Sequence, residues 1–168
     1  MPKKIDPLNK KAYGAVSAML TVADMKAAVT FYQKALGFQK RGVMNGPDGQ
    51  PMHAELRFRD TTLMLGPQSL GRGMRGPKSL GGTPCTLYLY VEKVDKVFAK
   101  AVQLGATTVM PVMDQFWGDR AGCLADPEGH VWMIATHAAD PTPAEMRKRQ
   151  KAQMAQMAAQ AQAAGGPA

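Results

Sequence analysis

The chain contains two copies of one structural unit, and this repeat restricts its possible folds more than any other feature of the sequence. An offset of 69 residues places Val22 on Val91 and Met64 on Met133. Hydrophobic periodicity predicts a strand, a helix and three further strands in each copy. The first copy has a strand over 15–22, a helix from Asp24 to Leu36, a strand over 38–44 and a hairpin over 52–65. The second copy has a strand over 85–91, a helix that Gly105 ends, a strand over 107–112 and a hairpin over 120–135.

The second hairpin has the clearest turn in the sequence. Strands over 120–125 and 130–135 flank the residues Asp126-Pro127-Glu128-Gly129. Asp bonds the backbone at the first position, Pro presets φ at the second, and Gly completes the turn. With Pro127 and Glu128 as the two central residues, Met133 is predicted to face Gly122, and the repeat then predicts that Met64 faces His53.

Composition indicates one compact globular body. The 168 residues are 45% hydrophobic and 20% charged, which is ordinary for a protein with a sizeable core. No apolar run is long enough for a membrane span, and residues 1–13 lack the apolar segment of a secretory signal. Cys85 and Cys123 are too few for a disulfide framework, and we interpret both as reduced core residues. We therefore expect a cytoplasmic protein with no membrane partner.

The net charge of +8 is concentrated at the two ends of the chain. Residues 1–13 and residues 141–168 each carry +3, which leaves +2 for the 127 residues between them. A nucleic-acid-binding protein needs a clustered basic face on the fold itself. The sequence shows no such cluster, so we do not expect a nucleic-acid partner.

Two segments lie outside the repeated units. The connector, residues 66–83, is rich in Gly, Pro and Ser and carries Arg72, Arg75 and Lys78; it reads as a mobile linker, with a functional lid as the alternative. Beyond residue 140, Thr142 and Glu145 form a capping box with Pro143 at the first helical position. A weakly amphipathic helix is expected to follow and to fray before Gly165, either solvated or docked on a partner subunit.

Four segments carry a resemblance to a known family. They are HAELRFRDTTLML at 53–65, PKSLGGTP at 77–84, LYVEKVD at 89–95 and DQFWGDRAGCLADPEGHVW at 114–132. With the tandem repeat, these segments resemble the vicinal oxygen chelate superfamily of glyoxalases, bleomycin resistance proteins and dioxygenases, in particular its PhnB-like branch. The resemblance implies an α+β fold in which tandem βαβββ units form paired cup-shaped mixed sheets with helices on the outside.

The resemblance also implies a division of the chain. It covers residues 14–138, as units over 14–67 and 83–138 joined by a linker over 68–82. Residues 1–13 would form a basic N-terminal arm and residues 139–168 a helical, Ala/Gln-rich tail.

Metal-dependent members of this superfamily hold their ion with ligands from the first and last strands of each unit, usually His, Gln or Glu. The resemblance places Ser17, Met64, Thr86 and Met133 at these four positions. A neutral hydroxyl and a thioether do not replace imidazole nitrogen or carboxylate oxygen around a hard or borderline divalent ion. The resemblance therefore implies the cup but not its usual metal, and we expect neither a metal nor another cofactor.

Strand parity extends the predicted cup lining, because residues two apart on a strand share a face. The candidate ligand-binding residues are Ser17, Met19, Met64, Thr86, Tyr88, Tyr90, Trp117 and Met133. Trp117 would stack on a planar ligand at the mouth of the cup. The opposite parity gives an apolar set that includes Leu20, Leu89 and Ile134, suited to packing on the helices.

His53 and Glu55 are the titratable groups expected in the cup. On one strand they form a candidate acid/base pair, with a structural ion pair as the alternative reading. Asp119 and Arg120 read better as a structural ion pair that closes the loop at Trp117. His130 has the parity of a helix-facing residue and is expected to support the turn.

The function predicted is that of a metal-independent small-molecule-binding protein, of sequestration or resistance type, for a partly aromatic ligand. Adaptable methionines on the cup wall favour binding over a site that needs strict placement. One alternative is a lyase, isomerase or dioxygenase of the same superfamily that uses His53 and Glu55. The other is an interaction module that works through the tail. Paired cups in the superfamily that the chain resembles usually bury their exposed faces and edges in a two-fold dimer, so the resemblance implies a homodimer.

Overall fold

The computed structural model describes Asn9 and residues 12–164. Most of the predicted basic N-terminal arm lies outside these residues. The first unit contains β1 (Met19–Val22), α1 (Met25–Lys34), β2 (Gln39–Asn45), β3 (Pro51–Phe58) and β4 (Thr61–Pro67), and the second contains β5 (Thr86–Tyr90), α3 (Val94–Gln103), β6 (Thr107–Asp114), β7 (Asp119–Ala125) and β8 (Val131–His137). The predicted tandem βαβββ repeat is confirmed.

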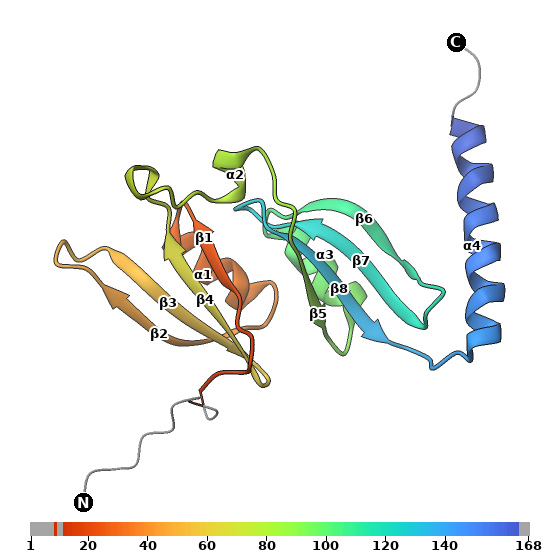
Figure 1. Ribbon diagram of the computed structural model, residues 1–168, viewed down its shortest axis with the longest axis horizontal. Coiled ribbons are helices and arrows are strands. Elements are labelled where there is room, and N and C mark those ends of the chain that lie inside the picture. The colour runs from red at the N-terminus through yellow and green to blue at the C-terminus, as the bar shows by residue number, and fades with distance from the viewer. Residues whose placement is uncertain (1–8, 10–11, 165–168) are drawn as a thin grey trace, which may run out of the picture.

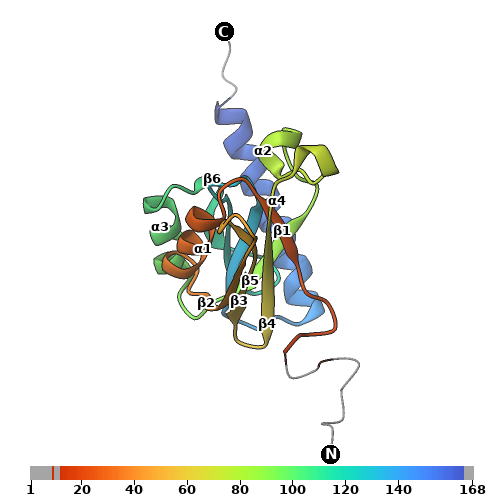
Figure 2. The same ribbon diagram turned by 90° about the vertical axis from the view of Figure 1, so that its left-hand side faces the viewer.

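Each unit folds its four strands into one mixed sheet, and the two sheets have the same topology. The orders are β1-β4-β3-β2 and β5-β8-β7-β6, with the first strand of each unit parallel to the last and the remaining pairs antiparallel. The sheets lie side by side, and α1 and α3 cover the same side of both (Figures 1 and 2). This is the predicted α+β architecture, with one sheet face in each unit left away from the helices.

Helix α1 begins where the sequence predicts, at a side-chain cap. The Oδ1 atom of Asp24 accepts hydrogen bonds from the backbone N–H groups of Lys26 and Ala27, each at 2.9 Å. The helix buries one stripe, which includes Phe31 and Tyr32, against its sheet. Helix α3 has the equivalent position in the second unit, because α1 and α3 are exactly one repeat apart in sequence.

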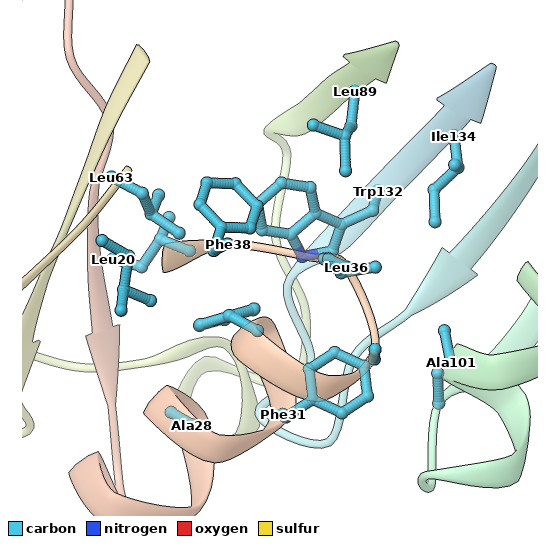
Figure 3. Packing of buried hydrophobic residues seen from close by; sticks show 14 of the residues in the cluster. Leu20, Ala28, Phe31, Leu36, Phe38, Leu63, Leu89, Ala101, Trp132 and Ile134 are labelled. Atoms are coloured by element: carbon cyan, nitrogen blue, oxygen red, sulfur yellow. The ribbon is translucent and has the colours of Figure 1, made fainter. Parts of the chain in front are cut away.

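An aromatic cluster joins the two units across their boundary. The ring of Trp132 lies 5.6 Å from that of Tyr32 and 6.1 Å from that of Phe38. The Tyr32 hydroxyl and the Trp132 indole N–H both donate to Asp126 Oδ2, at 2.6 and 2.9 Å. Figure 3 shows this packing, with Trp132 beside Phe38 and Leu36. Aromatic burial with satisfied polar atoms therefore holds the units as one core.

Both hairpins differ from the predicted register, by one residue in the second unit and by two residues in the first. Asp126 N–H donates to the His130 carbonyl at 2.9 Å, so the loop has three residues, and Gly129 takes the positive φ of +88° that such a loop needs. Met133 consequently pairs with Cys123 and not with Gly122. In the first unit Met64 pairs with Glu55 and not with His53.

Two further expectations are wrong at the level of local structure. The connector predicted to be a mobile linker contains η1 (Leu70–Arg72) and α2 (Pro77–Leu80), and the Gln68 side chain accepts hydrogen bonds from Gly76 and Ser79. Pro77 is buried, so the connector packs on the fold. Cys85, expected in the core, is exposed, whereas Cys123 is buried as expected.

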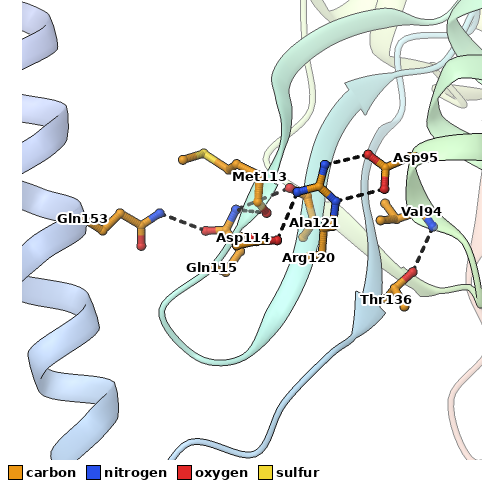
Figure 4. Close-up of polar contacts among 9 residues, drawn as sticks. All are labelled: Val94, Asp95, Met113, Asp114, Gln115, Arg120, Ala121, Thr136 and Gln153. Carbon is orange, nitrogen blue, oxygen red and sulfur yellow. Dashed lines mark hydrogen bonds and ion pairs between the residues drawn. The ribbon is translucent and has the colours of Figure 1, made fainter.

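The tail forms α4 (Pro143–Ala164), which stands apart from both sheets in Figure 1. The predicted capping box is confirmed, since Thr142 N–H donates to Glu145 Oε2 at 2.8 Å. A hydrogen bond connects the helix to the body: Gln153 Nε2 donates to Gln115 Oε1 at 3.4 Å (Figure 4). None of the described helices is long and apolar enough to cross a membrane.

Candidate functional site

The sheet faces turned away from α1 and α3 form two candidate binding surfaces, which we call the first and second cups. The first cup is lined by Met19, His53, Glu55, Thr62 and Met64, and the second by Tyr88, Tyr90, Asp119, Cys123 and Met133. The predicted parity is confirmed: Leu20, Leu89 and Ile134 are buried, whereas Met19, Tyr88 and Tyr90 are 53%, 46% and 43% exposed.

Residues from the N-terminal side of β1 lie against the first cup. The carbonyl of Ala12 accepts hydrogen bonds from Arg41 Nη1 at 3.1 Å and from Thr62 Oγ1 at 2.8 Å. The Tyr13 hydroxyl donates to Glu55 Oε1, and the Arg41 guanidinium lies 5.3 Å from the centre of the Tyr13 ring. This segment therefore covers part of the first cup within the chain itself.

His53 and Glu55 lie together in the first cup, as predicted, but Glu55 interacts more closely with Tyr13 and Arg41 than with His53. His53 Nε2 lies 3.7 Å from Glu55 Oε1, beyond hydrogen-bonding distance. Glu55 Oε2 pairs with Arg41 Nη1 at 3.3 Å, and Oε1 accepts the Tyr13 hydroxyl. The hydrogen bond to Glu55 raises the pKa of Tyr13, so this hydroxyl remains a donor. Both oxygens of Glu55 thus have structural partners.

The second cup contains a denser polar cluster, built around the buried carboxylate of Asp119. Its Oδ2 atom accepts hydrogen bonds from the hydroxyls of Tyr88 and Tyr90, at 3.0 and 2.8 Å, and from the indole N–H of Trp117 at 2.9 Å. Its Oδ1 atom lies 3.0 Å from Nδ1 of His137. The Asp119 side chain is only 2% exposed, so these four partners replace solvent around it.

Electrostatics fix the protonation states in this cluster. Burial alone would raise the pKa of Asp119, but its four hydrogen bonds, led by that from His137, lower the pKa below its ordinary value. The same contact with Asp119, and a second with Asp140, raise the pKa of His137. Burial and the bond to Asp119 raise the pKa of Tyr88 well above its usual range. The carboxylate is therefore ionised, and the phenols are neutral donors.

Asp119 consequently acts as a positioning residue for the aromatic side chains above it. Both of its oxygens are engaged, and a carboxylate with engaged oxygens has little capacity to act as a general base. The predicted ion pair between Asp119 and Arg120 is wrong, because Arg120 pairs instead with Asp95 at 2.7 Å and Asp114 at 3.0 Å (Figure 4). Successive residues on β7 point to opposite faces, which separates the two side chains.

The loop before Asp119 depends on a glycine. Gly118 has φ of +105°, and its carbonyl accepts hydrogen bonds from the N–H groups of Ala138 and Ala139 at 3.0 and 2.9 Å. A Cβ atom at this position would lie 2.0 Å from the Ala139 carbonyl oxygen. This close approach fixes Trp117 next to the end of β8, within reach of Asp119.

The four positions that the resemblance aligned with metal ligands do not fit a metal. Met64 and Met133 lie on cup faces, Thr86 is exposed at the start of β5, and Ser17 precedes β1 with its buried Oγ left without a hydrogen-bond partner among the described residues. Within the described part of the chain, no group of three or more His, Cys, Asp or Glu side chains could hold an ion. Hydroxyl and thioether groups do not supply the usual donor set.

Sequence reasoning missed His137 because the predicted strand ended at residue 135, and it misassigned the role of Asp119 because of the turn. In the true register Asp119 pairs with His137, and Met133 pairs with Cys123, so all four share the second cup. The one-residue error in the turn had put Asp119 on the opposite face. A signal for His137 was present, since it lies four residues after Met133 and shares its parity.

Comparisons with known proteins agree with this architecture. A model of the Glyoxalase/Bleomycin resistance protein/Dioxygenase superfamily matches residues 14–134. An uncharacterized protein of Mycobacterium bovis is 46% identical over 123 residues, which cover 71% of this chain and 81% of the relative. An uncharacterized protein of Mycobacterium tuberculosis has the same identity, over 72% of its own length.

Solved structures show the same fold. An Arabidopsis thaliana gene product has a TM-score of 0.60 and 27% identity, covering 73% of this chain and 98% of the other. A glyoxalase/bleomycin resistance protein/dioxygenase family enzyme from Burkholderia phytofirmans has a TM-score of 0.58 and 21% identity, covering 72% and 96%. With the tandem βαβββ units and the family match over most of the chain, these likenesses establish that the chain belongs to the glyoxalase/bleomycin resistance protein/dioxygenase superfamily.

Proposed function

We propose that the chain is a metal-independent small-molecule-binding protein whose site is the second cup. The observation that carries this proposal is the saturated carboxylate of Asp119, which holds Tyr88, Tyr90 and Trp117 in one place. A buried network with all its donors and acceptors paired favours a rigid recognition surface. Half-exposed tyrosine rings above that network offer area for a ligand.

The ligand expected is planar and partly aromatic. The hydroxyl hydrogens of Tyr88 and Tyr90 are directed to Asp119, so a ligand meets mainly the faces of the two rings. These rings lie 5.1 Å apart with an interplanar angle of 37°, an arrangement that presents a continuous aromatic surface. Met133 pairs with Tyr88 across the sheet and adds an adaptable thioether to the wall.

A second copy of the chain is proposed to supply the opposite wall. The two cups of one chain lie side by side and do not face each other, so neither closes over the other (Figures 1 and 2). Large apolar side chains are exposed on the strands, among them Met19, Val43, Met44, Met52 and Val109. Exposed apolar sheet faces and edges are unfavourable in a monomer, and a two-fold dimer would bury them.

The two alternative functions have weaker support. A lyase, isomerase or dioxygenase using His53 and Glu55 needs a free carboxylate, whereas Glu55 is engaged by Tyr13 and Arg41. An interaction module through the tail would rest on α4, which contacts the body through Gln153. Neither has a rigid, half-exposed surface comparable to that of the second cup.

Fluorescence titration against a panel of planar aromatic compounds tests the proposed site. We expect saturable quenching of Trp117, which Trp117→Phe should abolish because the other tryptophan, Trp132, is buried in the core. Tyr88→Ala should weaken binding by about tenfold, the loss of a stacking contact of about 1 kcal/mol or more. His53→Ala, the matched change in the first cup, should leave affinity unchanged.

A stability control separates the cup from packed core. Leu89→Ala, next to Tyr88 but facing the helices, should cost about 2–5 kcal/mol of unfolding free energy through a cavity, and Tyr88→Ala should cost less. If Tyr88→Ala unfolds the protein as badly as Leu89→Ala, or if no compound quenches the fluorescence, the second cup is not a ligand site.

A further inference from the structure

A pocket lies at the boundary between the two units, next to the end of α1 and the start of α3. It has a volume of about 480 Å³ and is formed by the end of α1, the turn between β3 and β4, and the segment that leads from β5 into α3. Both units contribute, and α1 and α3 lie on the same side of the sheets (Figure 2). The volume falls within the range of about 300–1,000 Å³ that is usual for small-molecule sites.

The lining of this pocket is strongly basic. Its charged members are Lys34, Arg59, Lys93, Lys96, Lys100 and one carboxylate, Glu92, which leaves a formal charge of +4. Along the sequence most of the positive charge lies at the chain ends, with no cluster within the folded body. Folding gathers one here, because the end of α1 comes next to the basic face of α3.

None of these cations forms an ion pair with a described residue, and Glu92 is the one carboxylate in the lining. Within the part of the chain that the structure describes, the ion pairs involve Arg41, Arg120 and two histidines, and none includes a basic residue of this pocket. Lys93 is the N-cap residue of α3, and Lys96 and Lys100 follow it at helical spacing on the helix, so these like charges repel. A bound anion would relieve that repulsion, which is a direct source of affinity.

The floor of the pocket is apolar. Leu36 and Val91 are buried beneath it, and Phe58 and Val97 are partly buried at its wall. Tyr90 borders the pocket as well, although its ring is held in the second cup by the hydrogen bond to Asp119. A purely inorganic anion would leave this apolar surface without a partner, whereas an anion with an aromatic or aliphatic body would cover it.

We propose that this pocket binds a soluble organic phosphate, with the phosphate groups on the lysines of α1 and α3 and the apolar body on Leu36, Phe58 and Val97. A charge of +4 matches a group that carries two or more negative charges better than a single carboxylate. Lysine binds phosphate as a point charge, and Arg59 adds a planar fork suited to two phosphate oxygens. The site shares Tyr90 with the second cup, but its charged groups and its apolar floor lie outside the cup, and either site can exist without the other.

The test is a titration of the full chain with methylanthraniloyl-ADP, a fluorescent nucleoside diphosphate, competed by inorganic pyrophosphate. We expect saturable binding of the nucleotide, and weaker competition by pyrophosphate, by about tenfold, because it has no apolar body. Lys96→Gln combined with Lys100→Gln should weaken nucleotide binding by about tenfold. Lys148→Gln with Lys151→Gln, an equal charge change on exposed positions of α4, should alter it by less than about twofold.

Each opposite result overturns the proposal. Absence of saturable nucleotide binding at low salt would remove the site. Equal weakening by the two double variants would mean that net charge attracts the nucleotide without a pocket. A further contradicting result would be that single-stranded DNA competes better than pyrophosphate does, with this competition lost in the variant Lys96→Gln, Lys100→Gln. That result would assign the basic pocket to a nucleic-acid polymer. Equal affinity for pyrophosphate and the nucleotide would exclude the apolar floor from binding.

Discussion

The hydroxyl of Tyr90 donates to Oδ2 of Asp119 over 2.8 Å, and this bond connects the end of β5 to the first residue of β7. The two strands are not neighbours, because β8 lies between them. The hydrogen bond therefore spans the width of the strand that carries Met133 and fixes the surface of the second cup across three strands.

Replacement of Asp119 by Asn should destabilise the protein. The change removes the negative acceptor for three donors and the partner of His137, so the free energy of unfolding should fall by about 2–4 kcal/mol. Urea denaturation measures the loss. Asp114→Asn is the matched control, since the side chain of Asp114 is 84% exposed and its ion pair with Arg120 should contribute less than about 0.5 kcal/mol. Equal effects of both changes would contradict the role given to Asp119.

Stability should depend on pH through His137 and Asp119. The pKa of His137 is higher in the folded protein than in the unfolded chain. Its contribution to folding stability is therefore fully present below the pKa of the unfolded state and is lost as the pH rises through the pKa of the folded state. The lowered pKa of Asp119 means that its contribution is present above the unfolded pKa and is lost as the pH falls through the folded pKa. The contact between His137 and Asp119 should therefore stabilise the folded protein most between about pH 4 and 6.5.

The variant His137→Gln isolates this effect. The difference in unfolding free energy between the wild-type protein and the variant should be largest near pH 5 and should shrink towards pH 9, as the imidazolium of His137 loses its proton. Denaturation curves across this range provide the measurement. A difference that grows with pH would show that the neutral imidazole is the stabilising form.

The assembly should be a homodimer that does not need the tail. Exposed apolar residues on both cups, such as Met19 and Tyr88, favour association of two copies, so light scattering should give twice the mass of the chain. Deletion of residues 144–168 should leave the fold intact, because both repeated units are complete before α4 begins and Gln153 contributes only a long hydrogen bond of 3.4 Å to Gln115. A monomer at micromolar concentration would exclude the proposed opposite wall of the second cup.

Metal content should be low in the purified protein. The hydroxyls of Ser17 and Thr86 and the thioethers of Met64 and Met133 do not suit nickel, zinc, iron or manganese. Elemental analysis after dialysis should therefore find far less than one of these metals per chain. About one retained metal per chain would instead direct attention to His53 and Glu55.

Local signals in the sequence predicted local structure well. The caps at Asp24 and Thr142 act within a few residues, and both form as expected. The alternating pattern of β5 identified which side chains face the helices, since burial of Leu89 and exposure of Tyr88 follow directly from the pleat. The repeat gave the topology, because equivalent segments fold into equivalent elements.

Long-range details could not be predicted in the same way. The sequence predicted a turn at residues 126–129 but not the additional loop residue, which Gly129 makes possible with a positive φ and which moves Asp119 to the other face. The contact of Tyr13 with Glu55 joins residues 42 positions apart, and the basic pocket joins Lys34 to the lysines of α3. Tertiary packing determines such contacts, and sequence periodicity carries little information about them.

A crystal structure of the protein with the tightest-binding aromatic compound tests the central claim most directly. The account predicts ligand density against the rings of Tyr88 and Tyr90, with Trp117 at its edge and Asp119 still holding the two hydroxyls. Density against His53 and Glu55 in the first cup, or a metal ion bridging the ligand to the protein, would contradict it.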